Sequence, residues 1–140
     1  MFKSVKTFAM VALLAATALM FTSCSKDAQI VGKWKITRAA SSDWTSVSDD
    51  RGETWTFKEK GKGTVIITGS DFDMTWSISS DNLTLEVDGV YLGGEKVSCT
   101  GDFVIDELKS KTMTISGNWI LKSGGTQVAK HKVTYEFDKK

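Results

Sequence analysis

Apolar and polar residues alternate with a period of two over most of the chain beyond residue 24. Such alternation is typical of β-strands that bury one face, and the spacing of an amphipathic helix is nowhere sustained. Clusters of glycine, asparagine, aspartate and serine interrupt the pattern and form the turns, since proline is absent. The pattern predicts strands at residues 30–38, 53–59, 63–68, 72–79, 82–87, 97–108, 112–121 and 126–137.

Most linkers between these strands are too short for anything but antiparallel hairpins. The exception is the long polar segment 39–52, which joins the first two strands. We therefore expect an all-β fold, an eight-stranded antiparallel up-and-down barrel, because closure removes both exposed sheet edges. An open sandwich is the alternative arrangement.

Apolar residues should face one another across each hairpin, and this condition suggests a register. The register places Trp76 opposite Leu85, Gly101 opposite Gly117, and Gly117 opposite His131. Two neighbouring glycines on the apolar face would leave a local hollow. Glycine within a strand also marks a bend or a close approach to the backbone. The alternative is therefore a barrel corner, or a space that a tryptophan from across the barrel fills.

His131 is the only histidine of the chain and shares its side-chain parity with Tyr135, so both should point inward, with Gln127 on the same face. A single inward histidine is commonly a hydrogen-bonded core residue. The functional interpretation is that His131 and Gln127 give an apolar cavity a polar end that orients a ligand. The hollow expected at Gly101 and Gly117 motivates this hypothesis.

The chain has five tryptophans. Trp34, Trp55, Trp76 and Trp119 fall on inward positions and are expected in the core or in the wall of a cavity. Trp44 differs, because it lies in the long polar segment. An aromatic ring on a loop can serve as a ligand lid, as a platform for sugars or as a partner contact, or it can fold back to cap the barrel.

The N-terminus has the pattern of a secretory signal: Lys3 and Lys6 precede an apolar run at 8–21 that is shorter than the ~20 residues of a membrane-spanning helix. Small residues directly before Cys24 make the segment resemble a bacterial lipoprotein signal. The expected organisation is a signal peptide at 1–23, a lipidated tether at 24–29 and a barrel domain at 30–140.

This resemblance implies that Cys24 becomes the mature N-terminus and carries diacylglycerol and usually a palmitate-type N-acyl chain. Two acyl chains suffice for stable anchoring, so the implied location is the cell envelope, at the outer membrane of a Gram-negative bacterium. The alternative is ordinary secretion without a lipid. Lipidation of Cys24 would leave Cys99 unpaired, and we interpret Cys99 as a small buried apolar side chain.

Charge and motifs limit the possible functions. The chain holds 18 basic and 17 acidic residues, and loss of Lys3 and Lys6 with the signal leaves 16 against 17, without a long like-charge block. A nucleic-acid partner is therefore not expected. Motifs for a catalytic serine, a phosphate-binding loop or a metal site are not recognisable, so neither an enzyme nor a cofactor is expected. Asp49 and Asp50 are interpreted as solvated loop residues.

Three segments carry a family resemblance: the Gly-Lys-Trp triplet at 32–34, and the stretches at 55–65 and 74–85. Together they resemble the lipocalin-like domain of small lipoproteins from Gram-negative gut bacteria. The resemblance implies a barrel that binds a small apolar molecule in its mouth.

In lipocalins the tryptophan of this triplet, here Trp34, closes one end of the barrel beneath an arginine from the end of the last strand. This chain has no such arginine, and Lys132, Lys139 and Lys140 are the cations that could take its place.

The expected function is a lipid-anchored envelope protein that holds a small apolar or amphipathic ligand in its barrel. One alternative is a glycan- or protein-binding module that uses the Trp44 segment, and another is a structural lipoprotein with a filled barrel. The candidate ligand-binding residues are Gly101, Gly117, His131, Gln127, Trp44, Trp55, Trp76, Trp119 and Tyr135.

Overall fold

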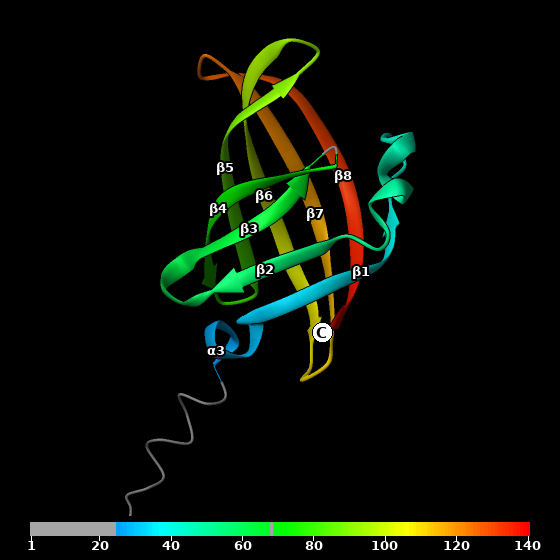
Figure 1. Ribbon diagram of the computed structural model, residues 1–140, viewed down its shortest axis with the longest axis vertical. Helices are drawn as coiled ribbons and strands as arrows, with labels where there is room; N and C mark the ends of the chain where they lie inside the picture. Colours follow the sequence, from blue (N-terminus) through cyan, green and yellow to red (C-terminus); the bar gives the residue numbers. More distant parts are fainter. Residues whose placement is uncertain (1–24, 68) are drawn as a thin grey trace, which may run out of the picture.

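The computed structural model describes residues 25–67 and 69–140, so the expected signal peptide and the lipidation of Cys24 lie outside the described residues. Its eight strands form one closed antiparallel barrel in sequence order, in which the last strand pairs with the first (Figure 1). This confirms the predicted barrel over the open sandwich. The strands are β1 (Gly32–Ala40), β2 (Thr54–Lys58), β3 (Lys62–Ile67), β4 (Ser70–Ser79), β5 (Asn82–Leu92), β6 (Glu95–Leu108), β7 (Thr112–Ser123) and β8 (Thr126–Lys139).

A short helix, α3 (Lys26–Ile30), lies at the end of the barrel where β1 begins (Figure 1). Ser25 caps this helix, because its side chain accepts a hydrogen bond from the Ala28 amide at 3.2 Å. Ile30, expected in the first strand, is instead the last residue of the helix and is fully buried. Trp34 donates from its indole nitrogen to the Ile30 carbonyl at 2.7 Å. The helix and Trp34 together close this end of the barrel.

Lys139 is the lysine that takes the position of the missing arginine. Its ammonium nitrogen lies 5.2 Å from the centre of the Trp34 ring, within the range of a cation–π interaction. The same nitrogen donates to the Gln29 carbonyl at 3.2 Å. The last strand therefore ties the plug formed by α3 and Trp34 to the barrel wall.

The segment between β1 and β2 contains a 3₁₀ helix, η1 (Thr45–Asp50), which packs against the open end of the barrel. Val47, on this helix, is buried and belongs to the core. Trp44, directly before it, is partly buried against the same core. Of the roles expected for this segment, folding back over the barrel is the one that the structure confirms. A second 3₁₀ turn, η2 (Glu59–Gly61), connects β2 to β3.

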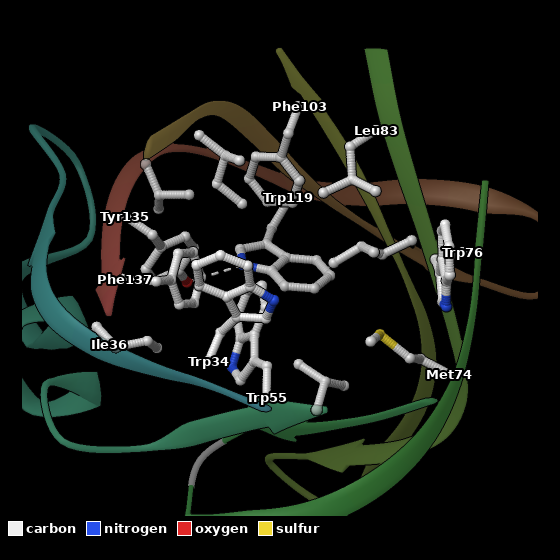
Figure 2. Packing of buried hydrophobic residues seen from close by; sticks show 14 of the residues in the cluster. Trp34, Ile36, Trp55, Met74, Trp76, Leu83, Phe103, Trp119, Tyr135 and Phe137 are labelled. Carbon is white, nitrogen blue, oxygen red and sulfur yellow. Dashed lines mark hydrogen bonds between the residues drawn. The ribbon is translucent and has the colours of Figure 1, made fainter. Parts of the chain in front are cut away.

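The inward face of the strands forms a continuous core in which aromatic rings meet edge to face (Figure 2). Trp55 is central to it, with its ring centre 5.0 Å from that of Tyr135 and 6.0 Å from that of Trp119. Trp34 and Trp76 are also buried, which confirms the inward positions expected for these tryptophans.

The register between strands is partly as predicted. Trp76 lies opposite Leu85, as expected, but Gly101 lies opposite Trp119, and Gly117 faces neither Gly101 nor His131. A shift of two residues buries the same side chains, because alternation repeats every two positions. The hydrophobic pattern therefore cannot distinguish the two registers, and the predicted pairings of the two glycines are wrong.

No hollow exists at the two glycines. The space beside Gly101 is taken by the rings of Phe103 and Trp119, and the β6 backbone at Asp102 and Phe103 approaches Gly117 closely. A tryptophan does help to fill the space at Gly101, but Trp119 comes from the neighbouring strand and not from across the barrel, and at Gly117 the backbone of β6 approaches closely. Any cavity must therefore lie elsewhere in the barrel.

Candidate functional site

A cavity of about 190 Å³ opens at the end of the barrel opposite α3. It lies where η1 and the upper ends of β3, β5, β6, β7 and β8 meet. Its wall is largely apolar and aromatic, with a small number of polar groups. The lining residues are Trp44, Asp50, Ile66, Ile67, Leu92, Cys99, Trp119, Leu121, His131 and Tyr135.

Four of the predicted site residues lie in or over this cavity, and strand alternation places three of them. Trp119 on β7 and His131 on β8 are direct cross-strand partners, and Tyr135 follows His131 on the same inward face. Trp44 reaches the cavity from the segment before η1, with its ring centre 5.6 Å from that of His131. The structure therefore brings these four predicted residues together at one cavity, and their role in binding stays a prediction.

Local hydrogen bonds fix Trp44 at the mouth. The Ser41 hydroxyl accepts from the Trp44 amide at 3.1 Å and donates to the Lys132 carbonyl on β8. The Trp44 indole donates to the Ser46 hydroxyl at 2.9 Å. Trp44 is thus held as a cover over one side of the cavity.

A chain of hydrogen bonds runs from the core to the mouth. The Trp119 indole donates to the Tyr135 hydroxyl at 2.9 Å (Figure 2), and this hydroxyl donates to Asp50 Oδ2 at 3.3 Å. Burial raises the pKa of Asp50 to about 6; the Tyr135 hydrogen bond opposes this shift, and Asp49 adds to it. Burial and the neighbouring Asp50 also raise the pKa of Tyr135, so its hydroxyl stays protonated.

Glu53, just before β2, is a second perturbed carboxyl group at this end of the barrel. Burial raises its pKa to about 7, and the negative charges of Asp50 and Asp71 contribute to the shift. Its Oε1 atom is buried without a hydrogen-bond partner in the described part of the chain. Burial and neighbouring negative charges therefore raise the pKa of both Asp50 and Glu53.

Cys99 contributes a thiol to the cavity wall. The residue is buried, as expected, and burial raises its pKa to about 11. The thiol is therefore protonated near neutral pH and acts as an apolar part of the wall.

The other predicted site residues lie away from the cavity. Trp55 is buried in the core, and Trp76 donates from its indole to the Lys58 and Lys62 carbonyls near the β2–β3 turn. The expectation that Gln127 points inward is wrong, because a bulge in the β7–β8 pairing, between Leu121 and Lys122, turns Gln127 outward. Gly101 and Gly117 belong to the filled part of the barrel, as described above.

Sequence reasoning missed Asp50, which was interpreted as a solvated loop residue. The structure brings it inward because η1 turns back over the mouth. A signal was present in the spacing of Trp44, Val47 and Asp50, which recur every three residues. This is the period of a 3₁₀ helix and places the three side chains on one face. For the aliphatic lining residues of β3, β5 and β7, the level along the barrel could not be assigned without the register.

Two searches of the described residues, 25–67 and 69–140, bear on other kinds of site. They contain no group of three or more histidine, cysteine or acidic side chains placed to hold a metal ion. In the same ranges, no helix has the length and apolar character needed to cross a membrane.

One comparison with known proteins gives a match. The family model described as a lipocalin-like domain matches residues 30–115, which is more than half of the chain. The matched region runs from the end of α3 into β7 and includes Trp34, Trp44 and Asp50. The chain matches no curated protein and no solved structure.

Proposed function

Because this chain belongs to the lipocalin-like domain family, we propose that it binds a small apolar or amphipathic molecule in the cavity at the open end of its barrel. The observation that carries the proposal is the composition of that cavity, in which apolar and aromatic walls surround a few polar groups. This is the usual make-up of small-molecule sites. At about 190 Å³ the cavity is smaller than the roughly 300–1,000 Å³ of sites for drug-sized ligands, so the ligand is expected to be small.

The rest of the molecule supports binding rather than its alternatives. The core below the cavity is packed with aromatic rings, so the mouth is where a ligand has room. Trp44 is partly buried against His131, which leaves less of its ring free as a sugar platform. The Cys99 thiol, the obvious nucleophile in the wall, is protonated near neutral pH because of its raised pKa. The proposed activity is therefore binding without a chemical step.

Filling the cavity should abolish binding. Leu121 lines the cavity from β7, and we expect Leu121→Trp to weaken the binding of 2-phenylethanol by at least about 30-fold, because the larger side chain occupies the ligand's space. Isothermal titration calorimetry measures the loss. Ile120→Trp is the matched control, since its side chain points to the opposite face of the strand. Equal binding by Leu121→Trp and the unchanged protein would contradict the proposed site.

The proposal includes a lipid anchor at Cys24 and a location at the outer membrane. Its support is the lipoprotein-type pattern of the first 24 residues. The position of α3 is consistent with it, because this helix, which directly follows Ser25, lies at the closed end of the barrel (Figure 1). An anchor on the residue before Ser25 would therefore leave the cavity mouth, at the opposite end, facing away from the membrane.

Metabolic labelling with palmitate tests this part of the proposal. We expect the label to enter the protein and to be lost completely in Cys24→Ser, which should also move the protein from the membrane fraction to the soluble fraction. Cys99→Ser is the control and should keep the label. An unlabelled protein that fractionates with soluble proteins would exclude the anchor and leave the ligand site unaffected.

A further inference from the structure

The lining of the mouth cavity combines aromatic, aliphatic and ionisable side chains. Trp44, Trp119 and Tyr135 provide aromatic surface, and the aliphatic side chains of β3, β5 and β7 provide the rest of the apolar wall. Asp50 adds a carboxyl group to this lining and His131 an imidazole. Among residues 25–67 and 69–140, no lysine or arginine lines the cavity.

Within residues 25–67 and 69–140, the Asp50 carboxylate in this wall has no cationic partner. Neither Asp50 nor Glu53 forms an ion pair there, and Asp50 accepts a hydrogen bond from the neutral hydroxyl of Tyr135. Arg51, the next residue along the chain, is exposed and forms no ion pair with it. A partly buried carboxylate without a cation is costly, and the cost falls when a positive charge binds beside it.

His131 is not paired with Asp50 within residues 25–67 and 69–140. The carboxylate near its Nδ1 atom is that of Asp43, whose Oδ1 atom lies 3.9 Å away. Negative charges act on both carboxyl groups, since Asp49 raises the pKa of Asp50, and Asp50 and Asp71 raise the pKa of Glu53. A ligand carboxylate would meet repulsion at this site.

The aromatic side chains of the cavity also favour a positively charged ligand. The faces of tryptophan and tyrosine rings attract cations, and Trp44, Trp119 and Tyr135 border the space next to Asp50. An ammonium group could therefore pair with the carboxylate while its apolar body fills the aliphatic part of the cavity.

We infer that the mouth cavity selects a small organic cation, an amine with an apolar body, whose ammonium group pairs with Asp50 beside the rings of Trp44 and Tyr135. This inference rests on the proposed function, because it assigns a ligand class to the same cavity. It goes beyond that function because it states that the positive charge of the ligand and the carboxylate of Asp50 determine which molecules the cavity binds tightly.

Three probes of similar size and different charge test it: 2-phenylethylamine, 2-phenylethanol and phenylacetate. Calorimetric titration of the unchanged protein at pH 7.5 should show the amine binding at least tenfold more tightly than the alcohol, with phenylacetate the weakest. Asp50→Asn should bring the affinity for the amine within about threefold of that for the alcohol. Asp49→Asn is the matched control, since Asp49 is the exposed neighbour, and it should keep most of the preference.

A change of pH gives a second readout that needs no variant. Asp50 has a pKa of about 6, so lowering the pH from 7.5 to 5 protonates it. The affinity for the amine should then fall by up to about tenfold, while that for the alcohol should not change. The groups that could also titrate around Asp50 and the cavity are Asp43, Asp49, Glu53, Asp71, His131 and Tyr135. Persistence of the pH effect in Asp50→Asn would assign it to one of these and contradict the role of Asp50.

The outcomes separate the two proposals. If amine and alcohol bind equally well, the selection of cations is wrong and the cavity remains a site for small apolar molecules. If phenylacetate binds most tightly, the cavity selects anions and the inference is again wrong. If none of the three probes binds, the proposed function and the inference both fail.

Discussion

Replacing Trp34 with alanine is expected to lower the free energy of unfolding by about 4 kcal/mol, within the usual range for a buried tryptophan. The ring is fully buried at the closed end of the barrel. Its removal opens a cavity there and leaves the Ile30 carbonyl without its donor, and the Lys139 ammonium loses the ring beneath it. Urea unfolding followed by far-ultraviolet circular dichroism measures the loss.

Trp44→Ala is the control for this experiment, because Trp44 is only partly buried and covers the opposite end. Its cost should be about 1 kcal/mol, as expected for a side chain that loses only part of its buried surface. Trp34→Phe, which keeps an aromatic ring but loses the indole donor, should lie between the two. A loss below 1 kcal/mol in Trp34→Ala would mean that the plug contributes little to stability.

Gly117→Ala is expected to destabilise the barrel by about 3 kcal/mol, at the upper end of the range for overpacking. A methyl group at this position would meet the Asp102 carbonyl oxygen and the Phe103 Cα atom, both of which belong to the backbone of β6. A side chain can move aside more easily than a paired strand can. The added methyl group therefore strains the hydrogen bonds between β6 and β7.

Gly101→Ala is the matched comparison for this prediction, since Gly101 is also an inward glycine of the same strand pair. There the added atom meets the outer atoms of the Phe103 and Trp119 rings, which can adjust more than backbone. Its cost should be smaller, and thermal unfolding of both variants gives the order. A larger effect of Gly101→Ala would show that the rings, and not the backbone contact at Gly117, limit the packing.

The barrel itself was predictable because alternation and turn residues specify which face of each strand is buried. Trp34, Trp55, Trp76 and Trp119 point inward as expected for that reason. The register between strands was harder to predict, since pairings that differ by two residues bury the same side chains. Bulges change the pairing further, as at the junction of Leu121 and Lys122, where Gln127 turns outward.

In the candidate site, too, some residues could be predicted from the sequence and others could not. His131 and Tyr135 could be assigned from parity alone, because parity survives a register shift of two. Asp50 could not be assigned in this way, because its position depends on how η1 folds back onto the barrel. The carboxylate that distinguishes this cavity thus comes from the segment with the weakest strand pattern.

The pairing of β1 with β8 has a consequence for how the molecule folds. Arg38 and Glu136 meet across this seam although they are 98 positions apart in the sequence, whereas every other strand pairs with its neighbour along the chain. Local hairpins can form early, but the seam carries the loop-closure entropy of nearly the whole domain and must await the last strand. Until then the sheet has two free edges that can pair with other copies. Closure of the seam is therefore the step that also protects the chain from aggregation.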